Sequence, residues 1–534
     1  MKRTGVYAVS ALLAGSALPL GLAGSPAAQA ASRTYYVSPS GSDGNTGTSP
    51  AKPFRTLQKA ADNTAPGDTV SVMNGTYTQR PGGSDVLVIS RSGRSGAPIT
   101  FQAHPGHHPV IHPVTAWNGI RVNGASHIAI RGLEVKGNNA NISLAEAERG
   151  ASTKHGKYNT NCVSVEKNRS TGSRPHHIEI AGNTVHDCAG GGISAGDADY
   201  VTIDRNHVYS NSWYTVFATS GISILAARDV DRGDSGTYKI RITDNVVHDN
   251  ETKVKWEHCK CYSDGNGIIV DTLKDKAKAG ATGPDYQGRV LVANNVSYDN
   301  GGSGIHSYKS QHVDILNNTA YQNGRSTRMD SYANIYAHNS TDVRILNNVA
   351  YGRAGQATNS KYKNVDVTYD YNVYYGGRAP EVKGPHDIVA DPRFVKPGTD
   401  AGADFRLREG SPAIASGKAV PAVTTDITGA RRSGVPDRGA YASDAVADTS
   451  PTAAATQDDV SSPQPSTPVG GPSEGQEPRR SDESAGGEGN DARPATAGEG
   501  LAQTGGGLVL PLGIAALTLM LGGALILLIR RRRA

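Results

Sequence analysis

Short runs of alternating β-branched and polar residues, each closed by asparagine, recur through the middle of the chain. In one such run Val201 and Ile203 alternate with Thr202 and Asp204 before Asn206. A period of two is typical of strands with one buried face, so valine and isoleucine are expected to point inward. Equivalent asparagines lie 23 residues apart where nothing is inserted, from 183 to 206 and from 295 to 318. This repeat predicts a solenoid.

Two further short strands follow each run. The second strand comes directly after the asparagine, as at Val246–His248, and the third begins with Gly-Ile, as at Gly192-Ile193 and Gly267-Ile268. Three strands per coil predict an all-β domain, a right-handed parallel β-helix over residues 31–441, in which the asparagines stack as a ladder. A leucine-rich repeat is excluded by the lack of a leucine frame, and a β-sandwich would not repeat in this register.

Both ends of the chain look like targeting segments. Residues 1–30 predict a secretory signal, with two basic residues, an apolar run and a small-residue cleavage site. Residues 442–500 are rich in Ser, Pro, Gly and acidic residues and predict a disordered stalk. The apolar stretch at about 508–529 is long enough to cross a bilayer, and four arginines follow it. We therefore expect a secreted protein that is held at the cell surface by a C-terminal transmembrane segment.

Residues 501–534 also resemble a sortase sorting signal of the LAxTG type. The pentapeptide Leu501-Ala502-Gln503-Thr504-Gly505 stands before the apolar stretch and the arginine tail. The resemblance implies cleavage between Thr504 and Gly505 and covalent attachment to peptidoglycan, with sortase as a partner. The alternative is a plain tail-anchored helix.

The predicted β-helix is mildly basic. The whole chain has a formal net charge of +5, to which residues 31–441 contribute about +7 and residues 442–504 contribute −8. A positive field attracts acidic polysaccharides and nucleic acids alike. Export favours the polysaccharide, so we expect an acidic polysaccharide substrate, no nucleic-acid partner and a monomer.

Four cysteines stand in a chain expected to meet an oxidising environment. We favour a disulfide between Cys162 and Cys188, because their separation is close to one repeat and would place them on neighbouring coils. A link between Cys259 and Cys261 needs unusually close Cα atoms. A zinc site at these two thiols with His258 is a weak alternative.

The two ends of the predicted solenoid resemble pectate-lyase-like β-helices of bacteria. The resemblance rests on residues 35–45, 53–60 and 66–70 at the start and on residues 390–394 and 411–414 at the end. It covers about residues 34–441 and implies an N-terminal helical cap, here a short helix from about Thr56 to Ala61, that closes the open end of the solenoid.

Polar side chains gather on the outer positions of the third strands. Asp264 precedes one of these strands, Asp271 ends it, and Lys309 follows the next. Carboxylates can bind calcium, and lysine can act as a general base. This combination suits β-elimination from a uronate polymer, because a cation on the carboxylate makes the C5 proton more acidic. The outer positions are Ser164, Glu166, Ser194, Ser223, Asp271, His306, Tyr308, Tyr336 and His338.

The arrangement resembles family 9 pectate lyases, in which clustered aspartates bind calcium and a lysine further along acts as the base. The resemblance implies calcium at Asp264 and Asp271 and proton removal by Lys309. The cluster is thinner here, because residues 266–268 read Asn-Gly-Ile where further carboxylates are expected.

Two other chemistries stay open at this stage. His306 and Tyr308 could serve as base and acid without a metal, and a pair of acids could serve a hydrolase. Each residue also has a plain structural role open to it: Asp264 suits a turn, and Lys309 suits a solvated surface.

Aromatic residues are the candidates for sugar binding. Trp213, Tyr214 and Trp256 fall in predicted loops, where an exposed ring can lie on a pyranose face. Tyr336 and His338 extend the same surface along the third strands.

These observations predict a polysaccharide lyase that cleaves a pectate-like uronate polymer. A glycoside hydrolase and a non-catalytic glycan-binding surface protein are the alternatives, since the fold cannot choose among them.

Overall fold

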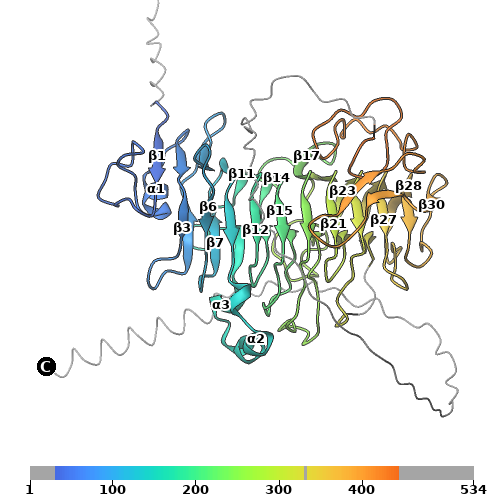
Figure 1. Cartoon of the computed structure of the whole chain (residues 1–534), viewed down its shortest axis with the longest axis horizontal. Helices are drawn as coiled ribbons and strands as arrows, with labels where there is room; N and C mark the ends of the chain where they lie inside the picture. The colour runs from blue at the N-terminus through green and yellow to red at the C-terminus, as the bar shows by residue number, and fades with distance from the viewer. Residues whose placement is uncertain (1–30, 330–332, 444–534) are drawn as a thin grey trace, which may run out of the picture.

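The computed structural model describes residues 31–329 and 333–443, which coil into one long solenoid of parallel strands (Figure 1). Most coils contribute one strand to each of three sheets, and within these sheets every strand pairs in parallel with its equivalents on the neighbouring coils. The prediction of a right-handed parallel β-helix is confirmed. The walls of the solenoid are called sheets A, B and C below.

The three sheets have the following strands in chain order. Sheet A contains β1 (Thr34–Val37), β2 (Thr69–Val72), β5 (Ile99–Ala103), β8 (Ile128–Arg131), β11 (His176–Ala181), β14 (Asp199–Asp204), β17 (Tyr238–Thr243), β20 (Arg289–Ala293), β23 (Gln311–Leu316), β26 (Thr341–Leu346) and β28 (Val365–Asp370). Sheet B contains β3 (Gly75–Tyr77), β6 (Pro109–Ile111), β9 (Glu134–Lys136), β12 (Thr184–His186), β15 (His207–Tyr209), β18 (Val246–His248), β21 (Val296–Tyr298), β24 (Thr319–Tyr321), β27 (Val349–Tyr351), β29 (Val373–Tyr375) and β30 (Ile388–Val389). Sheet C contains β4 (Asp85–Ile89), β7 (Asn118–Asn123), β10 (Asn161–Glu166), β13 (Ile193–Gly196), β16 (Ile222–Leu225), β19 (Ile268–Asp271), β22 (Ile305–Tyr308) and β25 (Ile335–His338).

Stacked aliphatic side chains fill the interior. In sheet A the paired positions run through Ile178, Val201, Ile240, Val290 and Val313, all of them buried. Because the strands alternate, a fixed register places all these side chains on the inner face. The hydrophobic effect therefore acts along the whole axis rather than at one central point.

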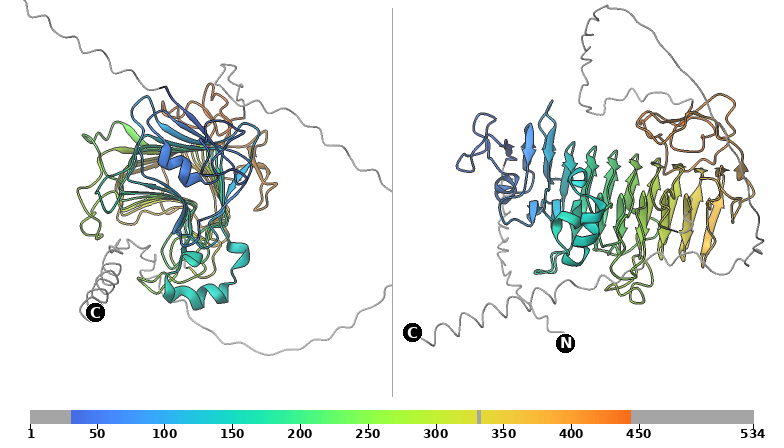
Figure 2. Two further views of the ribbon diagram at one scale, coloured as in Figure 1. Left: turned by 90° about the vertical axis from the view of Figure 1, so that its left-hand side faces the viewer. Right: turned by 60° about the horizontal axis from the view of Figure 1, so that its bottom comes forward.

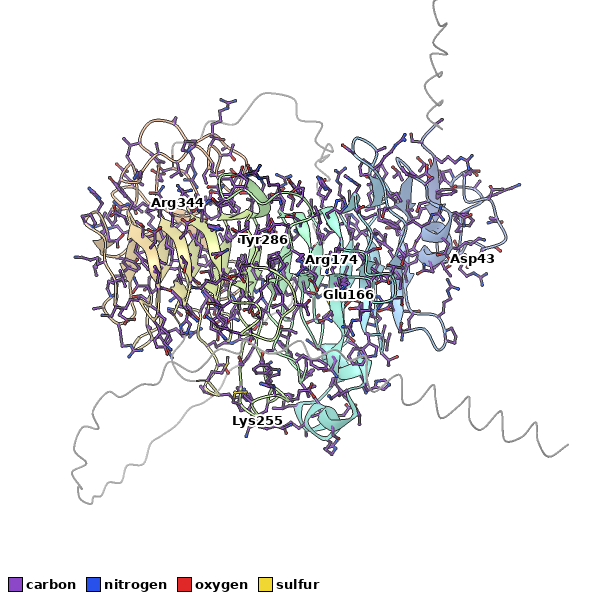
Figure 3. The ribbon with its side chains drawn as sticks, turned by 180° about the vertical axis from the view of Figure 1, so that it is seen from behind. Asp43, Glu166, Arg174, Lys255, Tyr286 and Arg344 are labelled. Atoms are coloured by element: carbon purple, nitrogen blue, oxygen red, sulfur yellow. A yellow bond between two sulfur atoms is a disulfide. The ribbon has the colours of Figure 1, made fainter. Side chains whose placement is uncertain are left out.

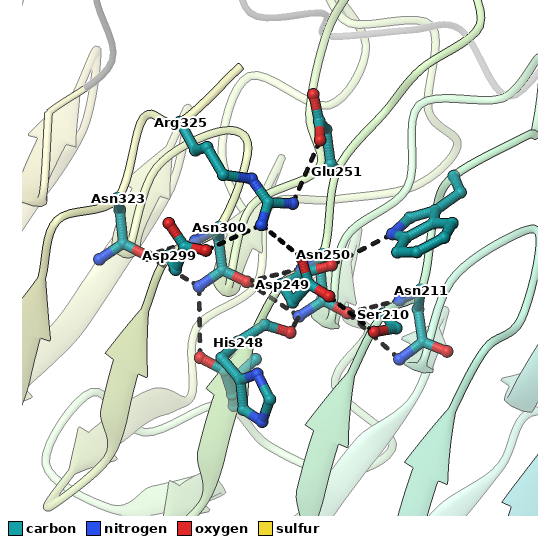
Figure 4. Close-up of polar contacts among 12 residues, drawn as sticks. Ser210, Asn211, His248, Asp249, Asn250, Glu251, Asp299, Asn300, Asn323 and Arg325 are labelled. Atoms are coloured by element: carbon teal, nitrogen blue, oxygen red, sulfur yellow. Dashed lines mark hydrogen bonds and ion pairs between the residues drawn. The ribbon is translucent and has the colours of Figure 1, made fainter. Parts of the chain in front are cut away.

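Asparagine ladders run along two corners. Between sheets A and B each amide nitrogen donates to the amide oxygen of the next coil, in the order Asn183, Asn206, Asn245, Asn295, Asn318, Asn348 and Asn372. A second ladder follows sheet B through Asn211, Asn250, Asn300 and Asn323 (Figure 4). Arg325 covers this ladder by pairing with Asp249, Glu251 and Asp299. The predicted stacking of asparagines is present in both ladders.

The N-terminal end of the solenoid is closed by α1 (Leu57–Asn63), close to the predicted helix. Thr56 caps it by accepting the N–H of Lys59, and Leu57 and Ala60 face the core. Figure 2 (left) shows α1 lying across the open end of the coils. At the other end a small antiparallel pair, β31 (Phe394–Lys396) and β32 (Asp404–Leu407), packs beside sheet B through Phe394.

A side lobe that the repeat pattern does not predict projects near the start of sheet C (Figure 1). It contains η1 (Asn139–Asn141), α2 (Leu144–Gly150), η2 (Ala151–Thr153) and α3 (Gly156–Asn159). Its small core joins Ile142 and Ala147 to Tyr214, Val216 and Val254. The lobe therefore leans on loops of later coils, and Lys255 lies on the same side of the molecule (Figure 3).

Both cysteine pairs form disulfides. Cys162 is joined to Cys188, as favoured from the sequence, with Cα atoms 5.7 Å apart. Cys259 is joined to Cys261 with Cα atoms 5.1 Å apart, a link that the sequence had disfavoured. The exposed loop curls tightly enough to permit it, and neither thiol is left for zinc.

The predicted localisation is corrected by the structure. No helix within residues 31–329 or 333–443 is long and apolar enough to cross a bilayer. The two longest α-helices there, α1 and α2, have seven residues each, whereas a membrane span needs about 20. The signal at 1–30, the stalk beyond residue 443, the Thr504–Gly505 cleavage site and the apolar stretch at about 508–529 lie outside the described residues.

Candidate functional site

The outer face of sheet C carries two columns of side chains in strict register. One column runs through Arg121, Ser164, Ser194, Ser223, Ile269, His306 and Tyr336. The other runs through Asn123, Glu166, Gly196, Leu225, Asp271, Tyr308 and His338. Parallel pairing thus brings residues more than 200 positions apart in the sequence onto one line.

The N-terminal half of this face is an open polar groove. A cavity of about 420 Å3 lies over β7 and β10, lined by Trp117, Arg121, Asn161, Glu166 and Phe217 among others. The rings of Trp117 and Phe217 lie 6.4 Å apart at its edge, and Glu166 is labelled in Figure 3. Cations, amides and aromatic rings along one groove suit an acidic sugar chain.

Arg121 is the central cation of this groove. Its guanidinium lies 3.5 Å from the Asp85 carboxylate and 3.3 Å from that of Glu166. Its Nε is buried and has no hydrogen-bond partner among the described residues. The two carboxylates therefore hold the half-buried guanidinium in a fixed orientation at the groove.

The C-terminal half of the face holds the predicted catalytic residues on neighbouring coils. Asp271 ends β19 and pairs with Tyr308 of β22, and Lys309 follows Tyr308 directly. Asp264 lies in the turn before β19 and is buried, whereas Asp271 and Lys309 are partly exposed. β19 is the third strand after β10, so these residues begin about 14 Å beyond the open groove, at about 4.8 Å per strand.

The two carboxyl groups are electrostatically perturbed. The pKa of Asp271 is raised to about 7, chiefly by burial and also by the Asp264 carboxylate, against the opposing effects of the Thr272 hydroxyl and the Lys309 ammonium. Burial likewise raises the pKa of Asp264 to about 6, against the hydroxyl of Ser263. A carboxyl with a raised pKa in a cleft is a candidate for proton chemistry.

The expected alternative pair, His306 and Tyr308, is buried rather than presented to solvent. The His306 ring stacks on Tyr336 at 4.7 Å, and neither of its nitrogens has a hydrogen-bond partner among the described residues. Burial lowers the pKa of His306 to about 3. Tyr308 stacks on His338 at 5.3 Å, and Lys309 Nζ lies 5.0 Å from the centre of the Tyr308 ring. The Lys309 side chain therefore packs beside the stacked rings of Tyr308 and His338.

The aromatic residues expected to bind sugar lie mostly inside the protein. Tyr214 belongs to the core of the side lobe, and Trp256 is buried beside His258. Trp213 is half-buried, with the Lys253 ammonium 3.2 Å from its ring centre. Tyr336 and His338 are likewise buried in the stack on sheet C. Stacking on a pyranose needs an open ring face, so we place the sugar-binding aromatics elsewhere.

Trp117 and Arg121 are the groove residues that the sequence reading missed. They flank Asn118-Gly119-Ile120, which has the same Gly-Ile start as β13, β16, β19 and β22 of sheet C. Extending that register one coil towards the N-terminus would have identified Arg121 as an outer-face residue. Phe217, in contrast, lies in a loop without a sequence signal.

Calcium needs six to eight oxygen ligands. Asp264 and Asp271 stand at opposite ends of β19, and no third Asp, Glu, His or Cys joins them at ligand distance among the described residues. The protein by itself therefore offers an incomplete cage, and most ligands would have to come from substrate carboxylates and water. Calcium remains a prediction.

The fold and the groove together define a class: right-handed parallel β-helix proteins with a polar groove on the outer face of one sheet. Residues 35–348 match the family model described as "Pel9A-like, right handed beta helix region". The chain belongs to this family.

Curated relatives are distant. The chain is 26% identical over 360 residues to the uncharacterized protein YwoF of Bacillus subtilis (strain 168), covering 54% of this chain and 73% of that protein. It is 25% identical over 307 residues to "Pectate lyase L" of Paenibacillus polymyxa (strain SC2), covering 51% of this chain and 64% of that protein. Among solved structures, pectate lyase Pel9A aligns with a TM-score of 0.46 at 19% identity, covering 77% of this chain and 96% of that one.

Proposed function

We propose that this protein is a polysaccharide lyase that cleaves a uronate-containing polymer by β-elimination on the outer face of sheet C. One observation carries the proposal: the carboxyl of Asp271, with its raised pKa, and the amine of Lys309 come from neighbouring coils and lie on the same side of the solenoid as a groove with an arginine at its centre. Family membership and a relative named pectate lyase support it.

The polymer lies along the solenoid axis, across the strands of sheet C. Arg121 pairs with a uronate carboxylate away from the reaction, and Trp117 and Phe217 border the sugar ring there. The reacting sugar lies over β19 and β22. The coils are about 4.8 Å apart, so equivalent side chains recur at this interval along the groove and can contact successive sugars of an extended polymer.

Lys309 takes the proton from C5 of the reacting uronate onto its Nζ. The electron pair of the broken C5–H bond forms a double bond between C4 and C5, and the C4–O bond breaks with its pair on the leaving oxygen. That oxygen then gains a proton from water. A positioned base contributes on the order of 10²- to 10⁴-fold to such a reaction.

Asp271 meets the carboxylate of the reacting uronate. Two carboxylates repel, so their approach needs a proton or a cation between them. At neutral pH the raised pKa of Asp271, about 7, provides that proton in part of the molecules. Calcium, as the family resemblance predicts, would be held by Asp271 and Asp264 together with substrate oxygens and would neutralise the charge more completely.

The deciding experiment measures new ultraviolet absorbance, which reports the unsaturated product, on a panel of uronate polymers with and without chelator. Lys309→Ala should lower the rate by on the order of 10²- to 10⁴-fold. Lys363→Ala is the matched control, because its Nζ also lies 5.0 Å from the centre of the preceding tyrosine ring, on a later coil.

Full activity in Lys309→Ala would refute the assignment of the base. New reducing ends without the absorbance would identify a hydrolase, and retention on a polysaccharide column without product would identify a binding protein. A loss of rate confined to chelated samples would establish the calcium requirement.

A further inference from the structure

Three histidines meet at one corner of the solenoid, at the N-terminal ends of two neighbouring strands of sheet A. His127 directly precedes β8, and His176 and His177 open β11 on the next coil. His127 and His177 have left-handed backbones with φ 54° each. The same corner position is left-handed in other coils, at Tyr200, His312, Asp342 and Asp366. This turn geometry directs one side chain per coil outward, and in two successive coils that side chain is an imidazole.

The ring nitrogens of these histidines converge. One nitrogen from each residue can be chosen so that all three lie within 4.8 Å of one another. His176 Nδ1 lies 2.8 Å from His177 Nδ1, and the ring centres of His127 and His177 are 4.5 Å apart. Among the residues that the structure describes, this is the one group of three His, Cys, Asp or Glu with such spacing.

A stacked column of rings explains only part of the arrangement. His127 stacks on His177, and His177 stacks on Tyr200 at 4.4 Å, with Lys239 Nζ 4.8 Å from the Tyr200 ring centre. His176 stands outside this column and meets His177 edge to face. Its Nδ1 nevertheless points at the Nδ1 of His177. Two such nitrogens at 2.8 Å must share either a proton or a cation.

We propose that His127, His176 and His177 bind a divalent transition-metal ion, with zinc as the first choice. Imidazole is a preferred ligand of zinc, and three histidines with water in the fourth position form a well-known zinc geometry. Zn–N bonds of about 2.0–2.1 Å would separate two ligand nitrogens by about 3.3 Å. His176 Nδ1 and His177 Nδ1, now 2.8 Å apart, must therefore move apart by about 0.5 Å, and the His127 nitrogen, which lies within 4.8 Å of them, must turn towards the same point.

The charges around the three histidines are mixed. Burial and the neighbouring imidazoles lower the pKa of each of the three histidines. Asp199 and Asp231 favour positive charge at His176 and His177, and Lys239 opposes it at His177. A cavity of about 480 Å3 lined by His127 and His177 gives an ion a route from solvent.

The site is separate from the groove on sheet C and independent of the proposed lyase function. A bound ion would tie the coil of β8 to the coil of β11. Since the unfolded chain does not hold the three rings together, metal binding should stabilise the folded protein.

The test titrates zinc alone into the metal-stripped full chain in competition with a chromophoric chelator. One zinc per chain should bind, X-ray absorption should show nitrogen ligands at about 2.0–2.1 Å, and zinc should raise the melting temperature. His176→Gln removes a direct ligand and should weaken zinc binding by more than about 100-fold. Loss of a residue that only hydrogen-bonds to a metal ligand already lowers metal affinity by about 10- to 100-fold. Lyase activity should not change.

The matched control is His104→Gln. His104 and His107 also form a close pair, with ring centres 4.7 Å apart, but their Nδ1 atoms are bonded to Ser71 and to the Asn74 N–H. Zinc affinity should be unaffected by this change. The proposal is overturned if the wild-type chain binds zinc no better than His176→Gln, provided that both have the same melting temperature without metal.

Discussion

Two rows of polar side chains run along this solenoid, and they are bonded in opposite ways. In the asparagine ladders each amide donates to the next coil and accepts from the previous one, as Asn250, Asn300 and Asn323 do (Figure 4). On the outer face of sheet C, His306 lacks partners for both ring nitrogens among the described residues, and Asp271 has a strongly raised pKa. An amide carries donor and acceptor together and can repeat from coil to coil, whereas an ionised carboxylate has no donor to pass on. The asparagine ladders form a closed row, in which the amides bond to one another, and this row stabilises the fold. The polar side chains on the outer face of sheet C form an open row, whose members are not bonded to one another in this way and are available for chemistry.

The largest expected effect is on the closed row. Asn300→Ala removes the oxygen that accepts from both the backbone N–H and the amide of Asn250. Two buried donors lose their partner, so the free energy of unfolding should fall by about 2–5 kcal/mol. Urea unfolding measures this change. Asn141→Ala, at an exposed position, is the control and should change it by less than about 0.5 kcal/mol; equal effects of both substitutions would contradict the comparison.

The open row should make stability depend on pH. Asp264 and Asp271 have pKa values of about 6 and about 7 in the folded chain, against 3.8 as the ordinary value. The folded chain therefore binds more protons than the unfolded chain between about pH 4 and pH 7. Their stabilisation is complete below about pH 4 and is lost as the pH rises towards 7, by up to about 1.4 kcal/mol per pH unit for each group.

Asp271→Asn should flatten that slope, as measured by urea unfolding at pH 5 and pH 7. Asp244→Asn is a matched control, because burial also raises the pKa of Asp244 to about 7, away from sheet C. It should flatten the slope as well but leave lyase activity intact, whereas Asp271→Asn should lower activity. An unchanged slope in both variants would show that these carboxyls titrate normally.

A smaller effect is expected in the groove. Arg121→Ala should raise KM for a uronate polymer about tenfold with little change in kcat, because the arginine binds substrate and transition state equally. Arg131→Ala is the control, since Arg131 pairs with Glu179 on sheet A. A fall in kcat with unchanged KM would move Arg121 into the reaction itself.

The smallest effect is expected at His306. His306→Phe keeps the stack on Tyr336 and removes two buried unpaired nitrogens, so stability should stay within about 1 kcal/mol of wild type or increase. Activity should persist, as measured by product absorbance. Loss of activity in a stably folded His306→Phe protein would make His306 the base in place of Lys309.

Much of the fold could be read from short-range pattern. The alternation around Val201 and Ile203, the asparagine at 206 and the helix near Leu57 each reflect local preferences, and the structure contains all three features. The side lobe at Leu144–Gly150 was not foreseen, because it interrupts the repeat and is stabilised by Tyr214 and Val254 from later coils.

The candidate site was only partly foreseeable. The Gly-Ile register placed Asp271, His306 and Lys309 on the outer face of sheet C, but it could not show that His306 and Tyr336 would be covered. Burial depends on loops that cross from other coils, and the strand pattern does not encode their paths.

The sequence by itself determined the coil: a two-residue alternation sets the inner and outer faces, and asparagine at a fixed period sets the corners. Only the tertiary structure decided which outer side chains stay open, that Arg121 shares a groove with Phe217 and that His127 meets His176. These contacts join residues about 50 to 100 positions apart, and their distances depend on the stacking of coils and the paths of long loops rather than on any local preference.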